Sequence, residues 1–499
     1  MKESDRSIPA RGKGGRLAII PLVLLSCLVA GAVWLDGCSS SDKPDSPVLA
    51  RVEVPEYLED LNLPVYADLE DGNEAYYALV VATRSELLKE RVSFSVIDEY
   101  LPGRRYLIAL EEQDGARQEA AQRCRVLYDD GQHIIVRYTA ALTELLPGLG
   151  FDLALMSDEP INDPVVGLFD RSARDAPPKR SSAAPAVPVS RDPLVGKMLT
   201  AVTEADVGSY LEALSGETPV TVEGAFYTFT TRHTKSGEPI RKATQYVYER
   251  LTAMGLNPGF ENWTFTDDEE TLSNRNVWAE IRGRTTPDRI IILIAHLDSI
   301  SNDGTGLAPG ADDNASSCAS LLAIADVMKN YRFHSTVRFV FTTGEEQSIH
   351  GARAHAEGAA KLQQDIVAVI NLDMVGYSKK TDPPSRPKQQ VKTRNQKNRT
   401  GYQKDVVIAD TYVTVVETYG LDAVFEAVVE DDGELASDHA PFWQKKYAAV
   451  WVIEYAERGY LNPEMHTEED RMKILNMPYC VAIARASLGT AAHLAGVID

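Results

Sequence analysis

The sequence predicts an α/β protein with a mixed, mostly parallel central sheet flanked by helices, preceded by a smaller α+β domain. First, helical and strand patterns alternate from residue 194 to the C-terminus, which is typical of parallel sheets with helical crossovers. Second, residues 290–294 read Ile-Ile-Ile-Leu-Ile, apolar on both faces as in a buried central strand. Third, several predicted strands run into His, Glu or Asp, and open parallel sheets collect functional groups beyond the carboxyl ends of their strands.

Composition limits the possible functions. The chain has 499 residues, 44% of them hydrophobic and 25% charged, which is enough for roughly two or three globular domains. Acidic residues outnumber basic ones by 73 to 51 and the formal net charge is −22, so we expect no nucleic-acid partner. Five cysteines are too few for a disulfide framework. The fold is therefore expected to depend on packed cores, with or without a metal.

The first segment, 1–37, has the pattern of a signal peptide or membrane anchor. Basic residues precede an apolar run over 17–35, the order found in export signals. The cluster Leu-Asp-Gly-Cys at 35–38 resembles a bacterial lipobox, which implies a lipid on Cys38 and a polar tether over 38–49. An uncleaved anchor is the alternative. Either reading predicts an exported, membrane-attached protein that faces the periplasm or the cell exterior.

The next segment, 50–169, is predicted to be a small α+β domain. Strand and helix patterns alternate in it without a catalytic motif; we expect strands at 78–82, 92–96, 106–110, 133–138 and 151–155, and helices at 86–90 and 140–146. Residues 170–193 are rich in Pro, Ala and Ser and read as a linker. Basic residues in this linker make it an accessible cleavage target.

The last segment, 194–499, contains the candidate catalytic and metal-binding residues. An amphipathic helix is expected at 240–254, where apolar residues recur three or four apart before Gly255. A single carboxylate after a strand is usually solvated or caps a helix, but here the pattern is repeated. Strand 289–295 leads to His296, 337–341 to Glu345 and Glu346, 366–370 to Asp373, and 448–453 to Glu454.

Six motifs in order identify a family. They are His296-Leu-Asp-Ser299, Pro309-Gly-Ala-Asp-Asp-Asn314, Gly344-Glu-Glu346, Asn371-Leu-Asp-Met374, Ser437-Asp-His439 and Pro463-Glu-Met-His-Thr467. Together they resemble the secreted bacterial zinc aminopeptidase family, whose relatives include glutamate carboxypeptidase, the glutaminyl cyclases and the transferrin receptor. The resemblance covers residues 198–499 and implies a zinc-peptidase fold.

The resemblance implies two co-catalytic zinc ions bridged by Asp313. One ion would take Glu346 and His466, and the other would take Asp373 and His296. Imidazole and carboxylate ligands at each site suit zinc and leave a position open. Since the ligands are mostly oxygen atoms, Mn and Co stay open as alternatives.

The resemblance also assigns two residues outside this ligand set. Glu345 matches the family's general base and acid, which takes a proton from the attacking water and returns it to the leaving amine. Asp298 is expected to accept the far ring N–H of His296 and so to fix its tautomer. The family places a cis peptide after the bridging aspartate, here at Asp313–Asn314.

The expected activity is therefore that of an aminopeptidase acting on peptides with a free N-terminus. A di-zinc carboxypeptidase or dipeptidase of the same family is the main alternative, and a non-catalytic surface protein is a weaker one. Segment 50–169 is either a propeptide or a permanent accessory domain. The oligomeric state, the preferred side chain and the natural substrate are left open.

Three features depart from the family pattern or lie outside it. Tyr377 and Tyr455 are candidates for the oxyanion donor, because the family's usual tyrosine positions hold other residues. The basic stretch 378–400 is expected to be a mobile surface insertion, or else a loop that touches anionic lipid or cell wall. The acidic run 430–434 is expected to be a solvated loop, or else a site that attracts a cationic substrate end.

Overall fold

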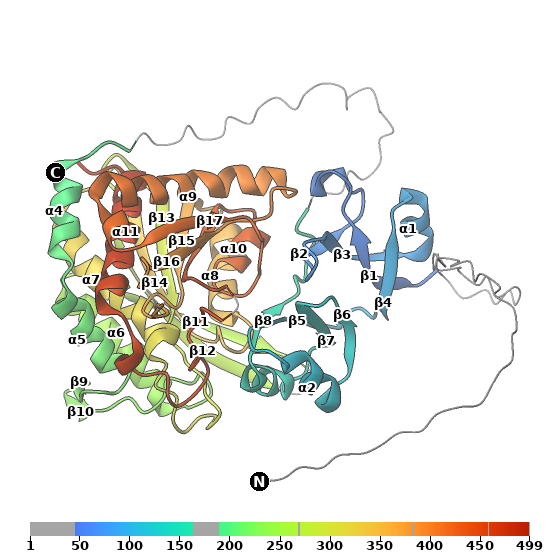
Figure 1. Cartoon of the computed structure of the whole chain (residues 1–499), viewed down its shortest axis with the longest axis horizontal. Helices are drawn as coiled ribbons and strands as arrows, with labels where there is room; N and C mark the ends of the chain where they lie inside the picture. The colour runs from blue at the N-terminus through green and yellow to red at the C-terminus, as the bar shows by residue number, and fades with distance from the viewer. Residues whose placement is uncertain (1–44, 163–188, 268–269, 382–383, 458, 499) are drawn as a thin grey trace, which may run out of the picture. The chain divides into compact units, whose positions relative to one another are not determined.

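The structure, a computed structural model, describes residues 45–162, 189–267, 270–381, 384–457 and 459–498. Residues 45–499 form one compact unit. Its main feature is an eight-stranded sheet in the order β11-β12-β14-β13-β15-β18-β16-β17, with helices on both sides (Figure 1). The four strands β14, β13, β15 and β18 are mutually parallel, whereas β12 and β16 pair with them in the antiparallel sense. The predicted fold class is thus confirmed.

The bounds of the strands and helices after residue 189 follow. The strands are β9 (Val220–Val222), β10 (Ala225–Tyr227), β11 (Gly259–Thr266), β12 (Thr271–Ile281), β13 (Thr286–His296), β14 (Ser335–Thr342), β15 (Asp365–Leu372), β16 (Lys388–Lys392), β17 (Glu426–Glu430) and β18 (Ala449–Glu454). The helices are α4 (Pro193–Ala201), α5 (Glu204–Leu214), α6 (Glu238–Ala253), α7 (Ser317–Met328), α8 (His350–Lys361), α9 (Arg399–Tyr419), α10 (Ala440–Gln444) and α11 (Met477–Ala495).

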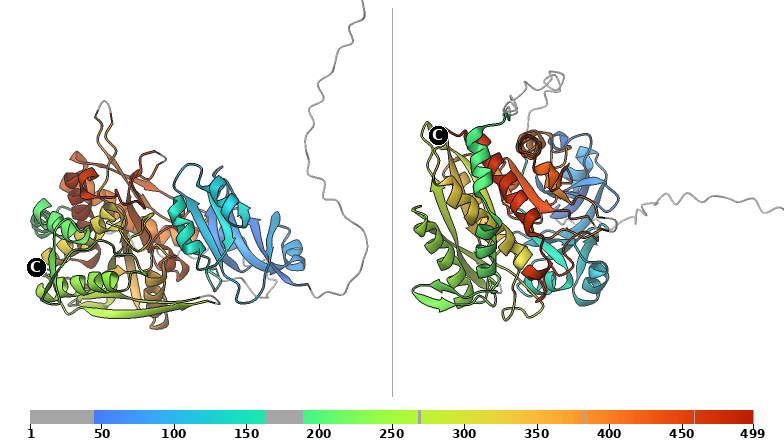
Figure 2. Two further views of the ribbon diagram at one scale, coloured as in Figure 1. Left: turned by 90° about the horizontal axis from the view of Figure 1, so that it is seen from below. Right: turned by 60° about the vertical axis from the view of Figure 1, so that its left-hand side comes forward.

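The residues before 163 form two four-stranded antiparallel sheets of their own, visible in blue and teal in Figure 2. One sheet has the order β2-β3-β1-β4, and the other has the order β6-β7-β5-β8. Their strands are β1 (Pro47–Glu53), β2 (Val65–Glu70), β3 (Tyr76–Thr83), β4 (Phe94–Glu99), β5 (Tyr106–Glu111), β6 (Val126–Asp129), β7 (His133–Arg137) and β8 (Phe151–Leu155). Their helices are α1 (Arg84–Glu90), α2 (Ala116–Arg123) and α3 (Leu142–Leu145). The smaller α+β domain predicted for the N-terminal part is present.

The central sheet is covered on both faces because its central strands are apolar on both. Alternate side chains of a strand point to opposite faces. Ile291 and Leu293 of β13 therefore pack with α4, α5, α6, α7, α9 and α11 in one core. Ile292 and Ile294 pack on the other face with α8, α10 and side chains of the N-terminal sheets. Burial on both faces explains why the sequences of β13, β14, β15 and β18 are continuous apolar runs.

The parallel arrangement brings the chemically competent residues to one edge of the sheet. His296 is the last residue of β13, Glu345 and Glu346 follow β14, and Asp373 follows β15. Because these neighbouring strands run in parallel, their carboxyl ends meet at the same edge. The turn Ala311–Ser316, which precedes α7, lies at this edge as well and carries Asp313.

The start of the chain differs from the prediction in one place. Strand β1 begins at Pro47 and pairs with β3 and β4, so the end of the expected 38–49 tether is part of a sheet. The predicted signal or anchor at 1–37, Cys38 and most of the predicted linker at 170–193 lie outside the described residues. Among the residues that the structure describes, no helix has both the length and the apolar character needed to cross a membrane.

The basic stretch 378–400 is not the surface insertion that its charge pattern suggests. Residues 388–392 form β16 inside the central sheet, and Lys392 is buried. Arg394 is also buried and makes a bidentate pair with Asp405 of α9, at 2.7 Å for both contacts. The prediction was wrong for residues 388–394, because their acidic partners lie on other elements: Asp405 on α9 and Asp432 in the acidic run.

Candidate metal centre

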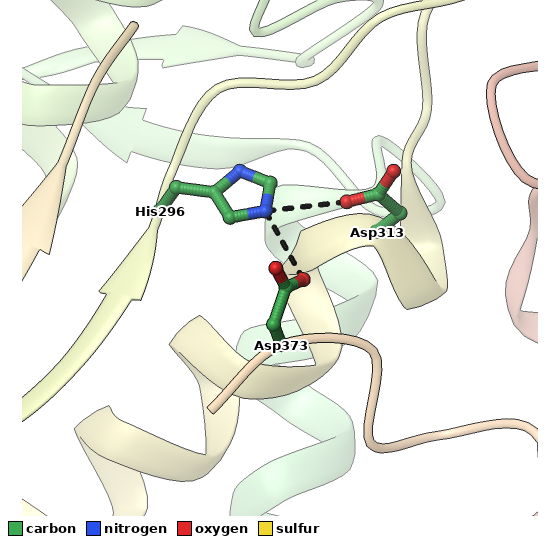
Figure 3. A group of neighbouring side chains, drawn as sticks. All are labelled: His296, Asp313 and Asp373. Atoms are coloured by element: carbon green, nitrogen blue, oxygen red, sulfur yellow. Dashed lines mark hydrogen bonds and ion pairs between the residues drawn. The ribbon is translucent and has the colours of Figure 1, made fainter. Parts of the chain in front are cut away.

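His296, Asp313 and Asp373 converge at the edge of the central sheet (Figure 3). The Nε2 atom of His296 lies 3.3 Å from Oδ1 of Asp313 and 3.2 Å from Oδ1 of Asp373. All three side chains are buried. The resemblance assigns these residues to one metal ion, and the structure brings their ligand atoms within 4.8 Å of one another.

A second group shares Asp313 with the first. Nε2 of His466 lies 3.1 Å from Oδ2 of Asp313 and 3.2 Å from Oε2 of Glu346. The two oxygens of Asp313 thus face two different imidazoles, which is the arrangement expected of a bridging carboxylate. The Asp313–Asn314 peptide bond is cis, as expected.

Negative charge dominates the centre, and its effect is visible in the pKa values. Burial raises the pKa of Glu346 to about 8, with a further contribution from Asp313. Burial alone would lower the pKa of His296, but Asp373 and other carboxylates outweigh it and hold that pKa well above its ordinary value. Glu346 and Asp313 raise the pKa of His466 in the same way. The surrounding carboxylates therefore favour the positively charged form of both imidazoles.

These residues fit two divalent cations. Each group offers one imidazole nitrogen and two carboxylate oxygens within 4.8 Å of one another. Oε1 of Glu346 is buried and has no hydrogen-bond partner among the described residues. An unpaired buried carboxylate oxygen is costly unless a proton or a cation satisfies it. Mixed imidazole and carboxylate ligands suit zinc.

Asp298 supports the centre in a different way from the one predicted. Nδ1 of His296 lies 3.1 Å from the main-chain carbonyl oxygen of Asp298 and 3.9 Å from its carboxylate. The carbonyl oxygen therefore accepts the ring N–H and selects the tautomer. The carboxylate instead accepts the hydroxyl of Thr234 at 2.8 Å and the main-chain N–H of Glu346 at 3.3 Å. It thereby holds the segment that carries Glu345 and Glu346.

Glu345 lies beside both groups but belongs to neither. Burial raises the pKa of its carboxyl well above the usual value; His296 opposes this shift, and Asp373 and Glu346 reinforce it. A carboxylate whose pKa is raised accepts a proton readily. This position agrees with the role of proton carrier that the resemblance implies.

Ser437 orients the ligand Asp373. Its hydroxyl donates a hydrogen bond of 2.5 Å to Oδ2 of Asp373 and accepts one of 2.7 Å from the side chain of Asn371. His439, of the same Ser-Asp-His motif, stacks on Trp451 and is a member of neither ligand group among the described residues. The motif therefore serves Asp373 indirectly.

Replacing Ser437 by alanine is expected to weaken zinc binding about 10–100-fold, because loss of a partner that orients a ligand typically has an effect of that size. The measurement is the zinc dissociation constant from competition with a fluorescent chelator. Thr414→Ala is the control, because that hydroxyl bonds only a main-chain oxygen of α9 on an exposed surface. Equal zinc affinity in Ser437→Ala and in the unaltered protein would contradict the role of Ser437.

Asp470 is a supporting residue that the sequence did not reveal. Its carboxylate accepts the main-chain N–H groups of Asp312 at 3.1 Å and of Asp313 at 3.0 Å. Asn462 links Asp470 to the carboxylate of Asp312. Burial raises the pKa of Glu454 well above its usual value, and the neighbouring carboxylate of Asp312 adds to the shift. No periodic pattern marks the loop that contains Asp470, 157 residues after Asp313.

The two candidates for the oxyanion donor, Tyr377 and Tyr455, stay predictions. The main-chain N–H of Tyr377 bonds Asp312, and the ring of Tyr455 packs on Tyr460. The acidic run 430–434 is half-buried rather than a solvated loop. Lys392 forms ion pairs with Asp432, at 2.8 Å, and with Glu434. Since this cation offsets one of the negative charges of the run, the run is a weaker attractor for a cationic substrate end than the sequence suggests.

The N-terminal domain also reaches the centre, although its sequence shows no catalytic motif. Oδ1 of Asp152, on β8, lies 3.9 Å from Nε2 of His466. Leu110, on β5, packs beside Met374 and Met465, the neighbours in sequence of two ligands. The signal that could have found them, strand alternation at 106–110 and 151–155, indicated the strands but not what they face.

Comparison with known proteins shows which peptidases the larger domain is similar to. Residues 276–491 match the sequence model of peptidase family M28. Leucine aminopeptidase 1 of Fusarium vanettenii is 26% identical over 273 residues, which make up 52% of this chain and 65% of the relative. A probable zinc metalloprotease of Pyrenophora teres f. teres is 31% identical over 216 residues, 39% of this chain and 46% of the relative. The chain therefore spans less than two thirds of the length of each of these relatives.

Solved structures share the fold. The crystal structure of the LapA aminopeptidase of Legionella pneumophila superimposes with a TM-score of 0.56 and 15% sequence identity, and covers 79% of this chain and 99% of that chain. Residues 189–499 alone make up less than this share of the chain, so the similarity extends into the N-terminal domain. The resemblance to zinc aminopeptidases is confirmed.

Proposed function

Since residues 276–491 match the sequence model of peptidase family M28, we propose that the chain is an aminopeptidase that uses two zinc ions to remove N-terminal residues from peptides. The observation that carries the proposal is Asp313, whose two oxygens face His296 and His466 at 3.3 and 3.1 Å. With Asp373 and Glu346 they provide one set of three ligands for each ion. Relatives named leucine aminopeptidase support the direction of cleavage.

Each residue of the centre then has a task. The bound zinc ions would acidify water and polarise the substrate's carbonyl group. Glu345 accepts the proton of the attacking water molecule and delivers it to the leaving amine. Asp298 and Ser437 hold the segments that carry Glu345 and Asp373 in place. Burial of the whole group excludes bulk water and strengthens each electrostatic interaction.

A carboxypeptidase or dipeptidase of the same family is the second candidate, because the same metal centre serves these reactions. A carboxypeptidase needs a basic side chain free to hold the terminal carboxylate of its substrate. Lys392, a cation beside the acidic run, is buried and already pairs with Asp432 and Glu434. This pairing favours the aminopeptidase.

The experiment uses the chain from residue 45, where the compact unit begins. A leucine arylamide, its N-acetylated twin and an N-blocked dipeptide with a free carboxylate are offered with and without a zinc chelator. We expect cleavage of the free-amine substrate alone, abolished by the chelator. Cleavage of the N-blocked dipeptide in its place would establish the carboxypeptidase alternative.

We further propose that the protein is exported and held at a membrane through a lipid on Cys38. The support is the order of basic, apolar and small residues before Cys38 in the sequence. Mass spectrometry of the full-length protein purified from bacterial membranes is expected to show an N-terminal Cys38 with attached acyl chains. An intact Met1 would contradict the lipid and support the anchor.

A further inference from the structure

Arg232 is a fully buried cation in the peptidase domain. It lies between β10 and α6 and is 0% exposed. Among the described residues, its side chain donates to four main-chain carbonyl oxygens and to no carboxylate. A buried charge is costly unless hydrogen bonds and opposite charges nearby compensate it. The four oxygens show what this buried cation holds together.

One of these oxygens belongs to the segment that carries the ligand His296. Nε of Arg232 donates to the carbonyl oxygen of Leu297 at 2.7 Å, and Leu297 directly follows His296. The main-chain N–H of Arg232 donates to the hydroxyl of Ser299 at 3.3 Å. That hydroxyl in turn donates to the carbonyl oxygen of Ala308 at 2.8 Å. Arg232 therefore fixes the chain just after His296.

Two further oxygens belong to the segment that carries the ligand Asp313. Nη1 of Arg232 donates to the carbonyl oxygen of Pro309 at 2.6 Å, and Nη2 donates to that of Gly310 at 2.9 Å. The oxygen of Gly310 also accepts the main-chain N–H of Ala315 at 3.1 Å, which closes the turn around Asp313. A Cβ atom at Gly310 would lie only 3.0 Å from Nη2, so a side chain here would crowd the guanidinium. Arg232 thus holds the start of this turn.

The fourth oxygen attaches both segments to the core. Nη1 of Arg232 also donates to the carbonyl oxygen of Leu214 at 2.7 Å, and Leu214 is the last residue of α5 and part of the main apolar core. A guanidinium presents its donors in a rigid planar fork. The three segments are therefore held at fixed separations. None of these bonds involves the segments that carry Glu346 or His466.

The charge of Arg232 also faces the metal centre. Burial lowers the pKa of its guanidinium, but nearby groups that include the carboxylates of Asp470 and Asp313 oppose the shift. Asp470 belongs to neither ligand group among the described residues. The cation therefore offsets negative charge that the zinc ligands leave over, and the carboxylates compensate its burial.

We propose that Arg232 is a positioning residue of the metal centre: it fixes His296 and Asp313 relative to each other through the main chain and so maintains the zinc site that they form with Asp373. The second zinc site depends on it less, because Asp470 separately accepts the main-chain N–H of Asp313 at 3.0 Å. This inference rests on the two zinc ions of the proposed function. It adds a residue, remote from both ions, on which one of them depends.

The test is Arg232→Lys in the metal-free chain from residue 45, with the Kd of each zinc ion measured by calorimetry. A lysine keeps the positive charge, but its donors share one nitrogen and cannot span three segments. We expect one ion to bind about 10–100-fold more weakly, as on loss of a partner that orients a ligand, and the other to keep its Kd. Asp373→Ala identifies the affected site. In that background, which leaves the second site alone, adding Arg232→Lys is expected to leave the remaining Kd unchanged.

Arg485→Lys is the matched control. Nε and Nη2 of Arg485, on α11, donate to the main-chain oxygen of Val202 at 3.1 and 2.8 Å, at the end of α4. Its replacement also removes an arginine from a main-chain oxygen, but in a segment that carries no ligand. We expect both zinc Kd values to stay those of the unaltered chain.

If Arg232→Lys does not fold, Ser299→Ala is measured in its place, with selective weakening of the same ion expected. Equal weakening of both ions would overturn the inference. A lower unfolding temperature with both Kd values unchanged would overturn it as well, because it would show a role in folding only. Fewer than two zinc ions in the unaltered chain would contradict the proposed function and the inference with it. Two bound ions without cleavage of a leucine arylamide would contradict the aminopeptidase alone.

Discussion

Replacing Glu345 by glutamine is expected to lower kcat on a leucine arylamide by about 10²–10⁴-fold, the usual contribution of a positioned acid–base group, with no loss of zinc. The amide keeps the shape of the side chain but has no carboxylate to accept a proton. Glu345 belongs to neither ligand group, so both should still bind metal. Steady-state kinetics and elemental analysis of the same sample provide the two measurements.

The neighbouring residue supplies a matched control. Glu346→Gln alters the same kind of side chain one position later, but its carboxylate lies 3.2 Å from Nε2 of His466. Its replacement is expected to lower the zinc content as well as the activity. A Glu345→Gln enzyme that keeps near-normal kcat would contradict the assignment of Glu345.

Replacing Asp313 by alanine is expected to lower the metal content more than Glu346→Gln does. Its two oxygens face both imidazoles, so one substitution removes a ligand from both groups. We expect the purified protein to bind less than one zinc ion per chain. We also expect kcat/KM to fall at least about 10³-fold, because metal ions stabilise such transition states by several kcal/mol.

Asp373→Ala is the comparison for this prediction. It removes a ligand from the group with His296 but not from the group with His466, so one zinc ion should remain tightly bound. Isothermal titration of the metal-free variants distinguishes the two outcomes. Two tight zinc sites in Asp313→Ala would contradict a bridging role for Asp313.

Three metal ligands, His296, Glu346 and Asp373, could be placed from the sequence because each lies at the end of a strand whose apolar run is clear, whereas Asp313 and His466 were assigned by the resemblance. The runs before His296, Glu346 and Asp373 are buried on both faces, so their order and direction place the ends at one edge. Main-chain partners were harder to predict. The orientation of the His296 ring decides whether it donates to the carbonyl oxygen or to the carboxylate of Asp298. The spacing of the two residues in sequence does not determine that orientation.

Buried polar residues account for the main errors. Lys392 and Arg394 look like surface charges, yet each is buried beside an acid that lies far from it in sequence or on another element. The contacts of Leu110 with Met374 and Met465 could not be predicted either, because strand alternation places a residue on a face without showing what that face meets. Contacts between domains of this kind need the three-dimensional structure.

The most direct test of the two-zinc aminopeptidase is a zinc titration of the metal-free chain from residue 45. Bound zinc and the initial rate on a leucine arylamide are measured at each addition, with the N-acetylated twin in parallel. The account predicts that the rate rises until two zinc ions are bound per chain and that the acetylated substrate stays intact throughout. A metal-free chain that already reaches the maximal rate, or equal cleavage of both substrates, would contradict it.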